Sequence, residues 1–408
     1  MRKLFILVFI LFSVFAKADY WTQKATFPGD ALRAPFSFSI GNKGYVGCGE
    51  DEFGSLYNDF WEYDRLTNVW TQKASFGGAA RELPTGFSIG NKGYAGLGTG
   101  IGLAIVYQDF WEYDPILNVW TQKANFGGGI RCGAIGFSIG SMGYVGTGSD
   151  NLIVGQFHND LWQYNSVTDT WLQKTNVPGP LRCESSCFAI GSKGYIIGGE
   201  NSALNLLNDL WEYNSVIDAW TQKANLPSYP RGDAAAFVIC DKGYFGIGDT
   251  LAGFLHDLWQ YNPSTNGWIS KANFPGLNRD EAAFFSIGNR GYIGLGGNDD
   301  FPLYNDFWEY TPDSACATGI PTITSTENSP ITISPNPFTI TTTLQIPTEL
   351  LKENCSLIIF DVIGKKVFQT VITKSNFEIS RKGLVDGIYF YKIICKEKNL
   401  GSGKMVIE

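Results

Sequence analysis

The stretch Asn58-Asp59-Phe60-Trp61-Glu62-Tyr63 decides the architecture of this chain, because five close copies of it follow. The copies occupy residues 108–113, 159–164, 208–213, 256–261 and 305–310. Their shared aspartates, at positions 59, 109, 160, 209, 257 and 306, recur at about 50-residue intervals, as expected when one supersecondary unit is repeated. Most of the chain is therefore predicted to be an assembly of six similar units.

Each copy of the phrase lies within the same succession of short runs. In the first unit these are an apolar run at 35–40, a turn at 41–44, a second run at 45–47, a variable loop, the phrase itself, and a last run at 69–73. Aromatic and β-branched runs separated by turn residues predict four short antiparallel strands. Gly44 and its equivalents are predicted to supply the positive φ of the hairpin turn.

The tryptophans and the chain ends predict how the sheets are arranged. All 12 tryptophans fall in the third or fourth strand of a unit, and because side chains alternate along a strand, both faces of each sheet must be covered. Residues Tyr20–Lys24 resemble a fourth strand without its first three, and the repeats stop at Tyr310, after a third strand. Joining these two fragments closes the ring and removes two sheet edges. The predicted fold is all-β: a six-bladed propeller closed by the N-terminal strand, followed by a small β-sandwich domain.

The repeat resembles the kelch family over about residues 20–310. The kelch pattern has an Arg before the inner strand, a glycine doublet after the second strand, an Asn-Asp-x-Trp-x-Tyr third strand and a Trp in the fourth. Only Gly198-Gly199 and Gly296-Gly297 keep the doublet, whereas the other units show Gly-x-Gly. The resemblance implies a propeller despite this departure.

The first 18 residues are predicted to be a signal peptide. Arg2-Lys3, an apolar run at 4–14 and Ala16-Lys17-Ala18 form its basic, apolar and small-residue regions. The run is too short to span a bilayer, and no later segment qualifies. Removing the three basic residues of this segment changes the formal charge from −8 to −11, which argues against a nucleic-acid partner.

The last part of the chain is predicted to be a separate domain. Residues 314–330 are rich in Thr, Ser and Pro and read as an extended linker between a propeller at 19–313 and a domain at 331–408. Within that domain, residues 335–338, 360–366, 387–389 and 404–407 together resemble the C-terminal sorting domain of the type IX secretion system. The resemblance implies export through the periplasm and the outer membrane to the cell surface or medium, with the type IX machinery as a partner.

Eight cysteines in an exported chain allow disulfides without requiring them. Cys355 and Cys395 both fall at or beside strand-like runs of the last domain and are the best candidate pair. Cys132, Cys183 and Cys187 serve equally well as small apolar residues.

Six arginines placed before the inner strands are candidate ligand-binding residues: Arg33, Arg81, Arg131, Arg182, Arg231 and Arg279. Around one mouth of the central channel, their planar forks of donors would hold a carboxylate or sulfate. The alternative is that each arginine hydrogen-bonds a neighbouring blade as part of the scaffold.

Positions that break the sixfold pattern are the candidate catalytic residues. Glu184, Asp233 and Glu281 each follow an arginine by two residues in three consecutive units. They would bind sugar hydroxyls or act as acid and base, with surface salt bridges as the alternative. Aromatic residues of the variable loops are expected on the same rim, either as ligand contacts or packed against the next blade: Tyr57, Tyr107, Phe157, Phe254 and Tyr304.

No cofactor or metal is predicted. His158 and His256 are the only histidines, so the copper centre of galactose oxidase, a relative of the kelch family, is not supported at matching positions. The EF-hand spacing is also missing from the acidic loops. The main hypothesis is an exported propeller that binds a glycan, peptide or surface partner at an Arg-lined mouth. The alternative is a sugar-active enzyme such as a mutarotase, which the resemblance allows because some kelch propellers act in this way on sialic acid; Glu184 with Arg182, or Asp233 with Arg231, would carry it.

Overall fold

The computed structural model describes residues 18–103, 105–151, 156–297, 302–313, 316, 331–347, 355–361, 366–372, 374–381, 383–395 and 398–407. The chain divides into two compact units, Met1–Cys316 and Ala317–Glu408. The predicted signal peptide, apart from Ala18, and the predicted linker, apart from Cys316, lie outside the described residues. Across the described ranges, no helix is long and apolar enough to cross a membrane.

The described part of the first unit contains six four-stranded antiparallel sheets, numbered here in chain order. Sheet 1 consists of β2 (Phe36–Ile40), β3 (Lys43–Glu50), β4 (Leu56–Asp64) and β5 (Val69–Gln72). Sheet 2 consists of β6 (Thr85–Ile89), β7 (Lys92–Gly96), β8 (Phe110–Asp114) and β9 (Val119–Lys123). Sheet 3 consists of β10 (Ile135–Ile139), β11 (Met142–Gly146), β12 (Leu161–Asn165) and β13 (Thr170–Lys174).

The remaining sheets of this unit repeat the order. Sheet 4 consists of β15 (Ser186–Ile190), β16 (Lys193–Ile197), β18 (Leu210–Asn214) and β19 (Ala219–Lys223), with β14 (Arg182–Cys183) and β17 (Glu200–Asn201) paired beside it. Sheet 5 consists of β20 (Ala235–Ile239), β21 (Lys242–Gly246), β22 (Leu258–Asn262) and β23 (Gly267–Lys271). A short 3-10 turn, η1 (Ile101–Leu103), lies in a loop of sheet 2.

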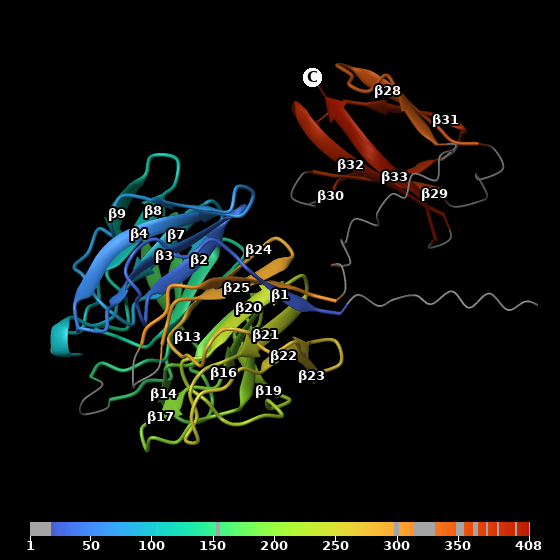
Figure 1. Ribbon diagram of the computed structural model, residues 1–408. Coiled ribbons are helices and arrows are strands. Elements are labelled where there is room, and N and C mark those ends of the chain that lie inside the picture. Colours follow the sequence, from blue (N-terminus) through green and yellow to red (C-terminus); the bar gives the residue numbers. More distant parts are fainter. Residues whose placement is uncertain are drawn as a thin grey trace, which may run out of the picture. The chain divides into compact units, whose positions relative to one another are not determined.

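Sheet 6 is completed by the N-terminal strand. It consists of β24 (Ala283–Ile287), β25 (Arg290–Gly294), β26 (Phe307–Thr311) and, at its outer edge, β1 (Tyr20–Gln23). In Figure 1, blue β1 lies beside the orange strands of this sheet. Trp21 pairs with Tyr310, whose hydroxyl donates to Asp19 Oδ2 at 2.7 Å. The predicted joining of the first and last segments is confirmed, and so is the all-β propeller fold.

Glycine and phenylalanine make the contact between neighbouring sheets. A Cβ on Gly44 would lie 2.1 Å from the ring of Phe285 in sheet 6, and one on Gly93 would lie 2.2 Å from Phe38 in sheet 1. The same contact recurs at Gly143, Gly194, Gly243 and Gly291. The prediction that Gly44 supplies the positive φ of the turn was therefore wrong. That role belongs to Gly41 (φ 59°), while Gly44 is small because the next sheet packs against it.

The cysteines have separate roles. Cys240, at the end of β20, forms a disulfide with Cys316, after β26, a bond that the sequence analysis did not predict. Among the described residues Cys48, Cys132, Cys183 and Cys187 are free, and burial raises the pKa of each thiol. They fill space as small apolar residues.

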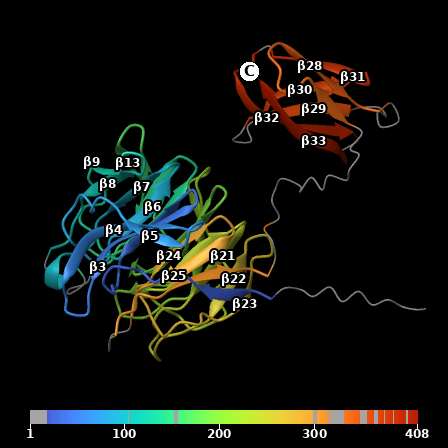
Figure 2. The same ribbon diagram turned by 45° about the horizontal axis from the view of Figure 1, so that its top comes forward.

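The second unit is a small β-sandwich with its own core (Figure 2). One sheet contains β27 (Thr332–Ser334), β28 (Thr341–Gln345) and β31 (Asn376–Ser380). The other contains β29 (Cys355–Phe360), β30 (Lys366–Ile372), β32 (Gly387–Cys395) and β33 (Lys398–Ile407). Cys355 is disulfide-bonded and lies directly opposite Cys395 in the strand pair. The side chain of Asn336 exchanges hydrogen bonds with the backbone of Lys404 and Val406, which explains why the Pro-Asn-Pro-Phe motif and the terminal strand occur together.

Candidate functional site at the mouth of the central channel

A ring of backbone hydrogen bonds surrounds one end of the channel, just before the inner strands. Each N–H donates to the carbonyl of the neighbouring sheet, over 3.0 to 3.4 Å. The ring runs through Ala34, Leu83, Gly133, Glu184, Asp233 and Glu281, and then returns to Ala34. All of these residues have positive φ, between 45° and 57°. Such a backbone is costly for residues other than glycine, so the hydrogen bonds between sheets are what hold it.

The channel inside the ring is a cavity of about 360 Å³, lined by the inner strands of all the sheets in this unit. Glu184, Asp233 and Glu281 line it from three consecutive sheets. The structure thus brings the three predicted catalytic candidates together at one end of one cavity.

A second tier of acidic residues lies beside this ring. The residues that precede the ring positions pair with the ends of the second strands in short bridges such as Arg33 with Glu50, Cys183 with Glu200 and Gly232 with Asp249. We call the following set the acidic mouth: Glu50, Glu82, Glu184, Glu200, Asp233, Asp249, Asp280 and Glu281. Arg33 lies among them, 2.7 Å from a Glu50 oxygen and 3.8 Å from Glu281.

Burial and mutual repulsion raise the pKa of five carboxyl groups of the acidic mouth, Glu82, Glu184, Glu200, Asp233 and Glu281. The pKa of Glu184 rises to about 7 because of burial and the charges of Glu200 and Asp249. The pKa of Glu82 also rises to about 7, through burial and Glu50. For Asp233 the pKa is raised well above its usual value by burial and by Glu184 and Glu281. Carboxyl groups that are half protonated near neutral pH can donate, accept or exchange protons, and they attract cations as they ionise.

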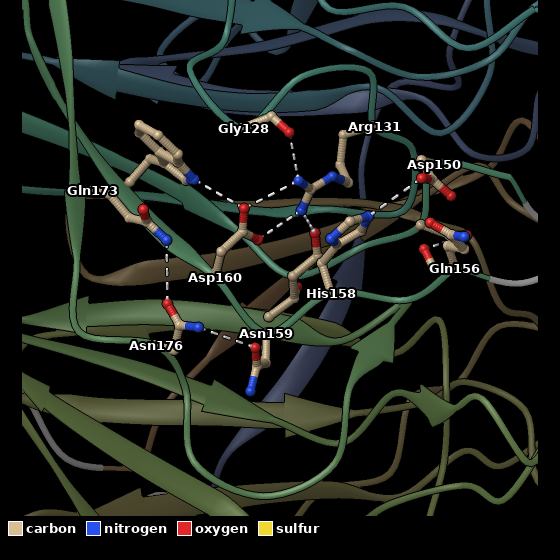
Figure 3. Close-up of polar contacts among 12 residues, drawn as sticks. Gly128, Arg131, Asp150, Gln156, His158, Asn159, Asp160, Gln173 and Asn176 are labelled. Carbon is tan, nitrogen blue, oxygen red and sulfur yellow. Dashed lines mark hydrogen bonds and ion pairs between the residues drawn. The ribbon is translucent and has the colours of Figure 1, made fainter.

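Five of the six predicted ligand-binding arginines are not available at the mouth, which corrects the expectation of an Arg-lined mouth. Arg81, Arg131, Arg182, Arg231 and Arg279 are at most 1% exposed. Each forms a two-pronged ion pair with the aspartate of the Asp-x-Trp phrase in its own sheet, with N–O distances of 2.5 to 3.0 Å. Figure 3 shows the copy in sheet 3, where Arg131 faces Asp160 and also donates to the carbonyl of Gly128. The arginines are scaffold, but they bind their own sheet rather than a neighbouring one.

Further hydrogen bonds within the same sheet stabilise each of these buried ion pairs. The same aspartate accepts a hydrogen bond from the indole of the following tryptophan, for example Trp162 to Asp160 at 2.8 Å. The arginine also donates to a backbone carbonyl at the end of the second strand, as Arg131 does to Thr147 at 2.7 Å. A buried charge is tolerated only when its donors and acceptors are matched in this way.

Arg33 differs from the other five because it stands one position later in its repeat. Ala34, which follows it, occupies the ring position of Leu83, and Leu83 comes two residues after Arg81. The residue equivalent to Arg81 is therefore Leu32. The assignment of Arg33 to the same series was therefore wrong by one residue. Because of this shift of one position, the side chain of Arg33 binds Glu50.

Two of the predicted aromatic residues of the rim stack on the buried arginine of their own sheet. Tyr107 and Tyr304 stack on the buried guanidinium groups of Arg81 and Arg279, with ring centroids at 4.0 and 4.6 Å. Phe157 is buried, and the Tyr57 hydroxyl donates to Asp51 at 3.0 Å. Exposed apolar side chains come instead from other positions of the variable loops, Phe53, Ile101, Ile105, Leu204 and Leu251, and from the segments that precede the inner strands, Ile130, Leu181, Tyr229 and Leu277.

Glu50, Glu200 and Asp249 were not predicted as site residues, since each stands at the start of a variable loop. They could have been found in the sequence from their shared position at the end of the second strand. In the structure, this position pairs with the residue that precedes the ring position. Among the described residues, no group of three His, Cys, Asp or Glu is arranged to hold a metal ion.

Comparisons with known proteins agree with this architecture. Residues 138–332 match the family model described as the KLHDC2/KLHL20/DRC7 Kelch-repeats domain, and residues 332–408 match that of the secretion system C-terminal sorting domain. A solved structure titled "Structure of YjhT" has 16% sequence identity and a TM-score of 0.60, covering 70% of this chain and 95% of that chain. A search of curated proteins found no match.

The sorting domain indicates secretion through the type IX system, to the cell surface or the extracellular medium. At 16% identity the solved structure supports the fold alone. The repeat pattern, the closed arrangement of four-stranded sheets and these matches together identify the chain as a kelch-repeat β-propeller followed by a type IX secretion sorting domain.

Proposed function

We propose that this exported propeller binds a positively charged segment of a protein or peptide at the acidic mouth. The observation that carries the proposal is the charge of that surface: Arg33 lies among eight carboxylates contributed by five sheets. Bringing a cationic group to this cluster relieves the repulsion that raises the pKa values of Glu184 and Asp233.

The surroundings of the mouth favour a polypeptide over a glycan. Exposed apolar side chains on the same rim, such as Phe53 at 83% and Leu251 at 87% exposure, supply the apolar contacts of a protein interface. The loops that carry them differ between sheets, as binding loops on a rigid scaffold usually do.

A direct test uses a short fluorescent peptide of alternating Lys and Leu, with a Glu and Leu peptide as the charge-reversed probe. We expect the purified protein to bind the first and not the second, more tightly above pH 7 than below it because the carboxyl groups ionise. The double variant Glu184→Gln with Asp233→Asn should weaken binding about tenfold or more.

The matched control is Asp241→Asn, which removes a negative charge from a turn at the other end of the inner strands. Asp241 is well exposed and pairs with Lys242. Equal affinity of the double variant and Asp241→Asn for the Lys and Leu peptide would refute binding at the mouth.

A second candidate function is acid–base chemistry on a sugar, favoured by one observation. Glu184, with a pKa of about 7, hydrogen-bonds Asp233, so this pair is suited to proton transfer near neutral pH. The arginine partners that the sequence analysis assigned to the reaction are not part of it, because Arg182 and Arg231 donate to Asp209 and Asp257. Loss of the anomerisation of a free reducing sugar in Asp233→Asn would support this activity over simple binding.

A further inference from the structure

Sheet 1 lacks the buried arginine that the other five sheets contain. Leu32 occupies the position of Arg81, as the matching ring hydrogen bonds of Ala34 and Leu83 show. A leucine side chain ends at the δ carbons, so the whole guanidinium group is missing. Arg33, the next residue, is bound to Glu50 at 2.7 Å and does not replace it.

The partners that bind this guanidinium elsewhere are nevertheless retained in sheet 1. Asp59 stands in the place of Asp109 and accepts the indole hydrogen bond of Trp61 at 2.5 Å. Cys48 matches Leu97, whose carbonyl accepts from Arg81 at 2.8 Å, and both residues have a φ of 63°.

The aromatic walls of the site are retained as well. In sheet 2, Arg81 lies over the rings of Phe76 and Tyr107, with its Cζ 4.9 and 4.0 Å from their centroids. Phe27 and Tyr57 take these two places in sheet 1. Phe27 packs on Trp61 with ring centroids 5.6 Å apart, much as Phe76 packs on Trp111 at 6.1 Å.

The missing cation leaves a polar atom unsatisfied. Asp59 Oδ1 is buried and has no hydrogen-bond partner, whereas the equivalent Oδ1 of Asp109 accepts from Arg81 at 2.6 Å. A second carboxylate is present, because Asp30 stands where sheet 2 has Ala79. Burial, together with the charge of Asp30, raises the pKa of Asp59. Sheet 1 thus has one carboxylate more than sheet 2 at this place and one cation fewer.

We propose that sheet 1 contains a binding site for a guanidinium group supplied from outside the chain, such as the arginine side chain of a partner, at Asp59, the Cys48 carbonyl, Phe27 and Tyr57. Five internal copies of this site hold a guanidinium through two-pronged hydrogen bonds, a geometry that an ammonium group or a spherical ion does not match. Asp30 is exposed and marks the side of entry. Because Asp59 Oδ1 is buried, binding at this site requires the Asp30 segment to move outward.

The site is independent of the acidic mouth, since it belongs to one sheet and uses none of the mouth residues. It also differs from the mouth in selectivity: the mouth attracts any cation, while this site requires the planar fork of a guanidinium.

The test measures methylguanidinium binding to the whole protein by titration calorimetry, with methylammonium and calcium as comparison cations. We expect saturable methylguanidinium binding by the native protein that is stronger than methylammonium binding. Asp59→Asn should weaken it about tenfold or more. Leu32→Arg, which supplies the guanidinium from within, should abolish the preference for methylguanidinium over methylammonium and raise the melting temperature.

The double variant Glu184→Gln with Asp233→Asn is the control, and it should bind methylguanidinium at this site as the native protein does. If that variant loses the binding while Asp59→Asn keeps it, the ligand is held at the mouth and the proposal is wrong. Absence of saturable binding, equal binding of methylammonium, or unchanged binding by a folded Leu32→Arg variant would each overturn it. Because Asp59→Asn and Leu32→Arg test the site separately, failure of one variant to fold leaves the other decisive.

Discussion

At the residue scale, the same side chain has different energetic roles in different repeats. Asp109 neutralises the buried Arg81, whereas Asp59, at the same position in sheet 1, has no arginine partner. The sequence pattern showed that every repeat carries an Asp and an Arg, but it did not show their pairing. The Asp and its Arg are 26 to 29 residues apart, and only the folded sheet brings them together.

This contrast predicts opposite outcomes for one substitution at two equivalent positions. Asp109→Asn leaves the guanidinium of Arg81 buried without a counter-charge, so the free energy of unfolding should fall by about 3–5 kcal/mol. Asp59→Asn removes a carboxylate whose ionisation burial already opposes, so the change should be close to zero or stabilising. Urea denaturation of the two variants measures both. Equal losses would contradict the role given to the arginine.

At the scale of the elements, the alternation of side chains predicts the short strands, and the turn residues predict where the strands end. The runs assigned as strands in the first repeat form strands in the structure. The Gly44 prediction was wrong because a glycine needed for close packing and a glycine needed for positive φ look alike in a sequence. A turn position is also hard to recognise where the glycine is replaced. Cys240 stands at the position of the turn glycine, has a φ of 62°, and forms a disulfide.

The Cys240–Cys316 bond ties the segment after β26 to the end of β20 across a sequence separation of 76 residues. Cys316→Ser should therefore lower the stability of the propeller by about 2–4 kcal/mol, because the unfolded chain loses a constraint. Thermal melting, with and without reductant, checks this. In Cys316→Ser the propeller transition should no longer respond to reductant, and a response of the same size as in the native protein would show that another disulfide is responsible.

At the scale of the whole molecule, the acidic mouth exists only because the ring closes. Its carboxylates come from sheets 1, 2, 4, 5 and 6, and the hydrogen-bonded ring holds three of them at the channel end. The three catalytic candidates were found from the sequence because they interrupt the sixfold pattern. Their pKa values depend on neighbours in other sheets, which no single repeat contains.

The mouth predicts how stability depends on pH. The pKa of Glu184 is about 7 in the folded protein and near 4.5 when unfolded, so the native state binds more protons between these values. The free energy of unfolding contributed by this group is then highest below about pH 4.5 and falls as the pH rises through 7, by a loss on the order of 3 kcal/mol. Glu184→Gln should flatten this part of the profile. Unfolding titrations from about pH 5 to 8 provide the measurement, and an unchanged slope in the variant would rule out the assigned pKa.

The sequence by itself determined the repeat, the four-stranded unit, the completion of the last sheet by the first strand, and the separate sorting domain. These features rest on local spacing and on side-chain alternation, which are properties of the chain before it folds. The tertiary structure alone decided which arginines are buried, which carboxylates share a cavity, and that sheet 1 retains a guanidinium site without its arginine. Such facts depend on contacts between residues far apart in the chain, where a shift of one position, as between Leu32 and Arg33, changes a buried ion pair into a surface one.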